Sequence, residues 1–299
     1  MILVDFSQIA IAGIFQFIDD MKKPEEEVEN VLRHVILTSV KGLKKQFKNE
    51  NKELVITIDS KVNGYWRHDL FPQYKFGRGN RTDDGIDWKM VHRVKNKIKD
   101  EIKLYLPWKT IEVPRLEADD IIGVLVRYSQ EHLTVANGLD DEPVPIMIVS
   151  SDSDLFQLHK YPNVKQWSGQ QKKQVGPRVT RENSNDLLLR KIAKGESGDG
   201  IPSILSPDNA FSEKIRQKPF KETRVLQFIA EGIEACTTDE ERTRYIRNKT
   251  LIDLEFTPQH LQDLVIVEYN KKIVGNKMKT YEYLAKNKCK MLMEDVDQF

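Results

Sequence analysis

Short apolar runs alternate with longer segments of helical periodicity along the first half of the chain. Between the apolar runs, Val28–Phe47 and Ala118–His132 carry apolar residues at the three- and four-residue spacing of an amphipathic helix. The apolar runs themselves are Ile2–Phe6, Leu54–Ile58, Ile111–Val113 and Pro145–Val149. Unbroken aliphatic strands are typical of a parallel sheet that helices cover on both faces. The pattern therefore predicts an α/β fold with a central, mostly parallel sheet flanked by helices.

The strand pattern fades after about Asn183. Polar, helix-rich sequence follows, with helical periodicity in Asn185–Lys194 and again from Thr223 to Cys236. We therefore predict two parts, an α/β core over residues 1–183 and a helical lobe over residues 184–299. Within the core, Gly64–Asp87 is rich in Gly, aromatic and basic residues, and Phe76–Gly85 has the composition of a surface loop. The predicted arch or clamp segment lies near residues 64–100.

Acidic residues follow the predicted strands where each strand ends. Asp5, Asp59 and Asp152 come directly after or at the end of three strands, and the carboxyl ends of parallel strands meet at one edge of the sheet. Further acids close to that edge are Glu117, Asp119, Asp120 and Asp154. Any one of them could cap a helix or close a turn. The whole set is harder to explain in that way, because so many like charges raise one another's pKa unless a cation neutralises them.

A divalent cation with oxygen ligands suits such a cluster. The set contains no His or Cys, which favours Mg²⁺ or Mn²⁺ over Zn²⁺. Two such ions about 3.5 to 4 Å apart activate a water and stabilise the leaving oxygen in phosphodiester hydrolysis. No P-loop motif is present, and no Gly-x-Gly-x-x-Gly follows the first strand. The acids therefore indicate metal-dependent phosphodiester chemistry rather than P-loop nucleotide hydrolysis or dinucleotide binding.

Composition narrows the picture only slightly. The 299 residues carry a formal net charge of +1, and the mean hydropathy is −0.54. No apolar stretch approaches the roughly 18 to 20 residues of a membrane span, and the start lacks a secretory signal, so we expect no membrane association and an intracellular location. Cys236 and Cys289, the two cysteines, have no metal-site spacing, which argues against structural zinc and a disulfide framework.

Basic residues concentrate directly after Asp59. Residues 61–99 contain ten Lys and Arg against four acids, a stretch that would attract a polyanion. Tyr65 and Trp66 lie among these charges and could stack on the bases of a single strand. Arg67 and Lys75 are the best candidates for contact with a phosphate, whereas the run from 89 to 99 has the pattern of an ordinary solvated helix.

Six segments together resemble the 5′-nuclease superfamily, which includes flap endonucleases and the 5′-nuclease domain of bacterial DNA polymerase I, and most of all its T-even phage ribonuclease H branch. They are Leu3–Ala10, Gly64–Arg67, Glu117–Asp120, Ser150–Asp154, Gln157–Ser168 and Lys194–Pro202. The resemblance covers roughly the first two hundred residues in order.

The resemblance implies roles for individual residues. The first metal ion would be held by Asp5, Asp59, Asp119 and Asp152, with Glu117 in support. The second would be held or oriented by Asp154, Glu196 and Asp199, although the family usually has aspartate where this chain has Glu196. Arg67 and Lys75 resemble the family's basic pair beside the scissile phosphate. With the four aspartates of the first site, they complete the predicted catalytic set.

Nucleic-acid contacts follow from the same resemblance. The segment from 76 to 88 would belong to an arch or clamp over the 5′ strand. The turn Gly195–Pro202 resembles that of a helix-three-turn-helix element, which holds duplex DNA through main-chain amides and often a K⁺ ion. The family's Gly-Ile-Gly run is absent after this turn. The predicted nucleic-acid-binding residues are Tyr65, Trp66, Arg67, Lys75, Arg78, Arg81, Gly198, Gly200 and Ile201.

The expected function is a 5′ to 3′ exonuclease and flap endonuclease with ribonuclease H activity. It would use two Mg²⁺ ions, replaceable by Mn²⁺, to remove RNA primers and adjacent DNA in lagging-strand replication. The resemblance implies DNA and RNA–DNA hybrids with a 5′ end or flap as substrates. We also expect a monomer in the cytoplasm of a phage-infected bacterium.

Alternatives remain open at this point. A PIN-type ribonuclease has a similar acidic sheet edge but needs neither the turn Gly195–Pro202 nor a helical lobe. A non-catalytic, structure-specific DNA-binding protein would not need intact acids. The tail Met291–Phe299 would either dock on a sliding clamp or single-strand binding protein or form a fraying last helix.

Overall fold

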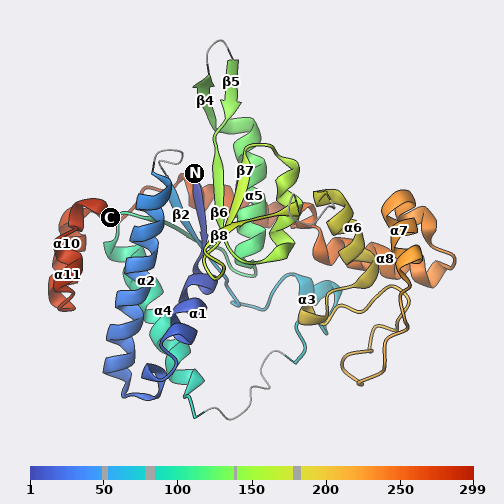
Figure 1. The fold of residues 1–299 in the computed structure, drawn as a ribbon, viewed down its shortest axis with the longest axis horizontal. Coiled ribbons are helices and arrows are strands. Elements are labelled where there is room, and N and C mark those ends of the chain that lie inside the picture. The colour runs from blue at the N-terminus through green and yellow to red at the C-terminus, as the bar shows by residue number, and fades with distance from the viewer. Residues whose placement is uncertain (49–52, 78–84, 138–139, 178–182) are drawn as a thin grey trace.

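The computed structural model describes residues 1–48, 53–77, 85–137, 140–177 and 183–299 (Figure 1). Up to residue 177 its main elements are β1 (Ile2–Asp5), α1 (Phe6–Gln16), α2 (Glu25–Phe47), β2 (Leu54–Ile58), α3 (Arg67–Leu70), α4 (Trp88–Tyr105), β3 (Lys109–Glu112), α5 (Ala118–His132), β4 (Thr134–Asn137), β5 (Asp140–Pro143), β6 (Ile146–Val149), η2 (Ser153–Lys160), β7 (Val164–Ser168) and β8 (Lys173–Val175). From residue 183 they are α6 (Ser184–Lys194), η4 (Ser197–Asp199), α7 (Glu222–Glu231), α8 (Asp239–Ile252), α9 (Gln259–Asn270), α10 (Lys277–Lys286) and α11 (Lys290–Met293).

A six-stranded sheet in the order β3-β2-β1-β6-β7-β8 forms the centre of the molecule. All neighbouring strands in it are parallel except β7 and β8. Every residue of β1, β2 and β6 is buried, as expected for strands with helices on both faces. The structure confirms the predicted fold class.

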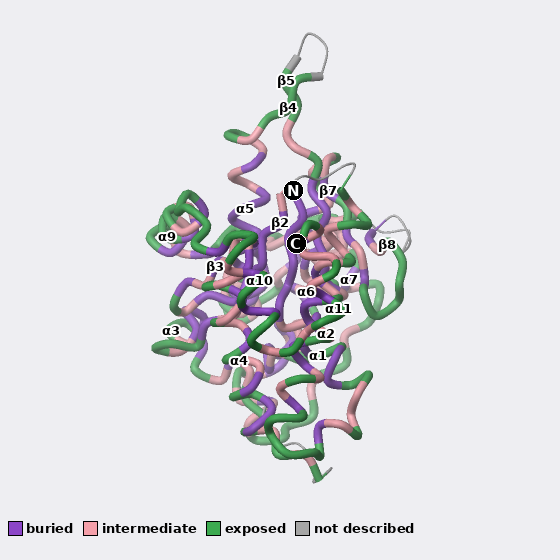
Figure 2. Tube along the Cα trace, turned by 90° about the vertical axis from the view of Figure 1, so that its left-hand side faces the viewer, coloured by how far each residue is buried: buried purple, intermediate pink, exposed green. Residues whose placement is uncertain are grey.

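Alternate residues of β1 enter two different cores. Ile2 and Val4 point into a core with α1, α2 and α4, whereas Leu3 points into a second core with α5 and α9. Figure 2 shows the buried residues along the central strands and on the helix faces turned toward them. Because side chains alternate between the faces, one short strand anchors both helical layers.

The hydrophobic pattern of the sequence did not predict two pairs of strands. The hairpin of β4 and β5, and the edge strand β8 with its neighbour β7, contain many polar residues and no unbroken apolar run. In β7, buried Gln166 donates hydrogen bonds to the carbonyls of Ser150 and Asp152 at 2.9 and 2.7 Å. A polar side chain thus supports the loop that follows β6, which a hydrophobic pattern cannot indicate.

The helices of the predicted span 184–299 do not all join the same core. Helices α6, α7 and α8 share a core of their own, to one side of the sheet in Figure 1. Beyond them, α9 packs on α5 and β3, and the C-terminal segment with Tyr283 and Phe299 packs into the core beside α2 and α4. The last helices return to the α/β core because their large apolar residues are buried there.

The predicted helix-three-turn-helix element is present only in part. Helix α6 and the turn that follows it are formed, but within the described residues 203–221 no helix begins, and the next one starts at Glu222. Turns and irregular chain fill residues 203–221 instead. Among the described residues, no helix is long and apolar enough to span a bilayer.

Candidate active site

Four aspartates lie at the carboxyl edge of the sheet. Asp5 ends β1, while Asp59 and Asp152 follow β2 and β6, the two neighbours of β1. Asp119 lies in the first turn of α5. Burial raises the pKa of Asp5 to about 7, and the nearby charges of Asp59 and Asp152 also raise it. The acids from distant parts of the sequence therefore interact with one another, as the strand-end pattern predicted.

Asp119 is the least compensated of these acids. Burial raises its pKa well above the usual value, and Asp152, Asp5 and further carboxylates add to the effect. Within the described residues, no group donates a hydrogen bond to the Asp119 carboxylate and no Lys or Arg pairs with it. A carboxylate held among carboxylates without a counter-charge suits the binding of a cation.

The other three aspartates, Asp5, Asp59 and Asp152, accept hydrogen bonds from uncharged donors. Asp59 accepts hydrogen bonds from the Ser7 hydroxyl at 2.6 Å and the Ala118 amide at 2.9 Å. Asp5 caps α1 by accepting from the Gln8 amide, and Asp152 caps η2 by accepting from the Asp154 amide. Helix capping and a place in the acidic cluster are therefore compatible roles for the same residues. None of the three forms an ion pair with Lys or Arg in the described part of the chain.

A second group of acids lies beside the first, and these acids have partners in Lys191 and Tyr74. Asp154 and Glu196 both contact the Lys191 ammonium, and Asp199 lies 3.0 Å from the Tyr74 hydroxyl. A small pocket of about 20 Å³, enough for one water-sized group, lies between the two groups. The carboxylates that line it are Glu117, Asp119, Asp154, Glu196 and Asp199.

The donor set fits hard divalent cations, since it offers only oxygen atoms close to the pocket. In the described part of the chain, however, no three Asp, Glu, His or Cys side chains already converge as a ligand set. Cation binding would thus require side chains of the cluster to rotate inward. The assignment of the eight acids to two metal ions stays a prediction.

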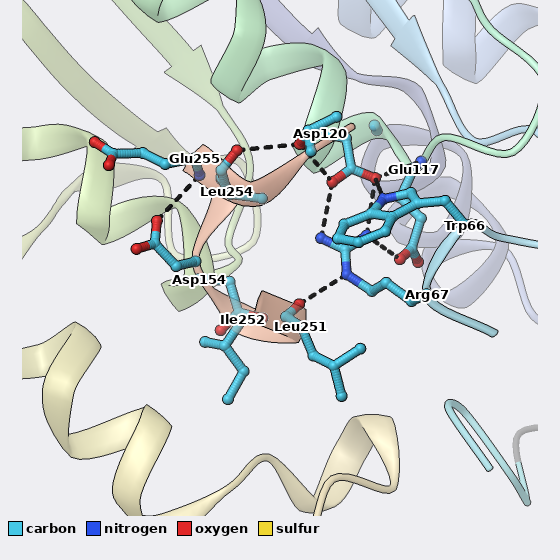
Figure 3. Close-up of polar contacts among 12 residues, drawn as sticks. Trp66, Arg67, Glu117, Asp120, Asp154, Leu251, Ile252, Leu254 and Glu255 are labelled. Carbon is cyan, nitrogen blue, oxygen red and sulfur yellow. Dashed lines mark hydrogen bonds and ion pairs between the residues drawn. The ribbon is translucent and has the colours of Figure 1, made fainter. Parts of the chain in front are cut away.

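Arg67 differs from its predicted place beside a phosphate. It is 3% exposed, and Figure 3 shows its guanidinium held by Glu117, Asp120 and the Leu251 carbonyl. The contacts to Asp120 are both 2.8 Å, that to Glu117 is 3.0 Å, and that to the carbonyl is 2.7 Å. Because all three guanidinium nitrogens already donate to protein groups, Arg67 ties α3 to α5 and α8. Its side chain also lines the small pocket beside Asp119.

The two aromatic residues before it also differ from expectation. Tyr65 and Trp66 are 5% and 4% exposed, and the Trp66 indole donates to Asp120 at 3.2 Å. They cannot stack on bases from these positions. Lys75 does lie at the cluster, where its ammonium contacts Glu117 and is 3.9 Å from Asp199. Arg78 and Arg81 fall outside the described residues.

The turn after α6 depends on two glycines. Gly195 has φ +72°, and a Cβ on it would lie 2.3 Å from the Ile201 carbonyl oxygen. The amides of Gly200 and Ile201 donate within the turn to Ser197 and Glu196 at 3.1 and 3.0 Å. These two amides are therefore not turned to a DNA backbone as predicted, because the turn itself uses them. Gly198 lies on the exposed side of the turn.

Replacing Gly195 with Ala is expected to destabilise the protein by about 2 kcal/mol or more, since the substitution combines a left-handed conformation with a steric clash. Urea unfolding measures the loss. Gly198→Ala is the matched control, because an added Cβ there meets only Glu196 Oε1, at 3.8 Å. Equal midpoints for both variants would contradict this account of the turn.

Two lysines at the site were missed from the sequence. Lys191 contacts Asp154 and Glu196, and Lys95 of α4 lies near Asp59 and Asp5, whose charges oppose the lowering of its pKa by burial. Lys95 lies in a stretch with the sequence pattern of an ordinary solvated helix. Lys191 lies in a stretch with the pattern of an ordinary amphipathic helix. No sequence signal separates such lysines from solvated ones, because helix packing decides which of them reach the acids.

Comparisons with known proteins identify the family of the chain. The family model described as "5'-3' exonuclease, N-terminal resolvase-like domain" matches residues 1–185, and "T4 RNase H, C terminal" matches residues 183–299. The chain is 31% identical to Ribonuclease H of Enterobacteria phage T4, over 99% of this chain and 95% of that protein. It is 29% identical to a thermostable DNA polymerase I of Thermus thermophilus, over 40% of this chain and 12% of that protein.

Solved structures share the fold. The T5 D15 protein co-crystallised with metal ions superposes with a TM-score of 0.65 at 15% identity, over 90% of this chain and 97% of that one. The T5 D15 flap endonuclease in a pseudo-enzyme-product complex with DNA and metal ions gives 0.60 at 17% identity, over 96% and 98%. With matches to both halves of the sequence and an acidic sheet edge, the chain belongs to the 5′-3′ exonuclease family, in its branch with a T4 ribonuclease H type C-terminal region.

Proposed function

We propose that this protein is a metal-dependent 5′ to 3′ exonuclease and flap endonuclease, with ribonuclease H activity, that hydrolyses phosphodiesters at the carboxyl edge of its sheet. Mg²⁺ is the proposed cofactor, with Mn²⁺ as a substitute. The substrates are DNA and RNA–DNA hybrids with a 5′ end or flap. Removal of primers during replication in a phage-infected cell is the role that fits this activity.

The observation that carries the proposal is Asp119. A partly buried carboxylate among four others, with no counter-charge in the described part of the chain, is costly unless a cation binds beside it. A non-catalytic DNA-binding protein has no use for such an arrangement, and a decayed site would relieve it. Two metal ions would supply an activated water and stabilise the leaving oxygen.

The chain's own residues hold and orient the reaction site. Asp5, Asp59 and Asp152 accept hydrogen bonds from amide and hydroxyl donors, which hold them at this edge of the sheet. Lys75, whose ammonium contacts Glu117 and is 3.9 Å from Asp199, is the proposed contact to the substrate phosphate. Arg67 holds Glu117 in place by donating a hydrogen bond to its carboxylate.

A 5′-flap substrate tests the proposal directly. The purified protein is expected to release short 5′-phosphorylated products from a labelled flap in Mg²⁺, and none in EDTA. Matched substrates with a flap of DNA, a flap of RNA and no free 5′ end separate flap cleavage, ribonuclease H activity and nicking. Binding of the flap without cleavage in either Mg²⁺ or Mn²⁺ would favour the non-catalytic alternative and remove the proposal.

A further inference from the structure

Lys191, three residues before the end of α6, reaches across to η2. Its ammonium contacts Asp154 and lies 2.9 Å from the Ser153 hydroxyl and 3.4 Å from Glu196 Oε2. An ammonium has three N–H donors and no acceptor, so these three oxygens account for all of its donors. The side chain is 21% exposed, which means that the group is held at the wall of the site rather than in bulk water.

The two carboxylates it touches come from different parts of the molecule. Asp154 lies in η2, after β6, and Glu196 lies in the turn after α6. Both line the small pocket next to Asp119, and they belong to the predicted second metal position. A divalent cation and an ammonium compete for these carboxylates, because the two positive charges repel each other at this distance.

We propose that Lys191 is a resident counter-cation of the second metal position, which has to leave Asp154 and Glu196 before a divalent cation binds there. The inference rests on the proposed function, since it presupposes that the acidic cluster holds divalent cations. Among the described residues, no ammonium is in direct ion-pair contact with Asp5, Asp59, Asp119 or Asp152, although Lys95 lies near Asp59 and Asp5. The two positions therefore fill at different cation concentrations, with the position at Asp154 the weaker.

A purely structural role for Lys191, as a tie between η2 and α6, makes a different prediction. Loss of a tie lowers stability and leaves the affinity for cations unchanged or reduced. Loss of a competing charge raises the affinity of the second position. The two roles are therefore separated by the sign of the change in cation affinity.

The test is a Mn²⁺ titration of the full chain without nucleic acid. Electron paramagnetic resonance measures the concentration of unbound Mn²⁺ at each step. For Lys191→Met and Lys191→Gln, the weaker position is expected to tighten by about tenfold or more, because a unit charge a few ångströms away is removed. The tighter position stays unchanged. Lys191→Arg keeps the charge and stays close to the wild type. Lys194→Met removes an exposed charge from the same helix and is the matched control.

Thermal unfolding first establishes that each variant is folded. The inference is overturned if the Mn²⁺ affinity of the weaker position is unchanged or lower in both folded uncharged variants. It is also overturned if the two positions of the wild-type protein bind Mn²⁺ with equal affinity. If the wild type cuts a 5′ flap but these variants titrate as the wild type does, only the inference falls. If the wild type neither binds Mn²⁺ nor cuts, the proposed function falls with it.

Discussion

Asp119→Asn is expected to lower flap cleavage in Mg²⁺ by about 10³-fold or more, since it removes a carboxylate charge from the centre of the proposed metal site. The amide keeps the size of the side chain, so the fold and the DNA-binding surface should persist. Single-turnover cleavage of a labelled flap measures the loss. Fluorescence anisotropy in EDTA is expected to give an unchanged affinity for the same flap.

The same substitution should stabilise the protein in EDTA. A folded-state pKa raised above the unfolded value means that stability is lost as the pH rises, because ionisation is costlier in the folded chain. Asp119→Asn removes this cost, so its melting temperature should exceed that of the wild type at pH 8, with a smaller difference at pH 4. Asp19→Asn, which changes a carboxylate that is 94% exposed, is the control for both measurements. Cleavage within tenfold of the wild type would remove Asp119 from the proposed mechanism.

Arg67→Met is expected to destabilise the protein by about 3 to 5 kcal/mol, because it leaves buried Asp120 and Glu117 without their guanidinium. Asp120 is 0% exposed, and its remaining donors are the Trp66 indole, the Thr257 hydroxyl and the Glu117 amide. Urea unfolding with a two-state fit measures the loss. Adding Asp120→Asn to the variant should recover part of it, since the uncompensated charge is then gone.

The control is Arg93→Met, which breaks an exposed pair with Glu25 and should change stability little. The experiment also distinguishes the two roles considered for Arg67. A phosphate contact would lose substrate affinity at full stability, whereas the buried ion pair loses stability first. A stable Arg67→Met protein with weakened DNA binding would restore the role predicted from the sequence.

Much of the fold was predictable because burial leaves a periodic pattern. The strands at Ile2, Leu54 and Ile146 were evident as unbroken apolar runs, and α5 occupies the predicted residues 118–132. Strands β7 and β8 were not evident, because their many polar side chains leave no such run. The sequence did not show that α9 and the C-terminal segment pack on the α/β core, since an amphipathic helix does not indicate which core it joins.

The sequence by itself determined that carboxylates gather at one edge of the sheet. Parallel strands end at the same edge, so an acid at the end of each apolar run has to meet the others. Only the tertiary structure decided which cations reach that edge. Arg67 and Lys191 are both basic residues at helix positions in the sequence. Arg67 is buried in ion pairs with Glu117 and Asp120, whereas Lys191 contacts Asp154 and Glu196. Their places depend on how α3 and α6 pack against α5 and η2, and this packing between segments distant in the sequence leaves no local trace in the chain.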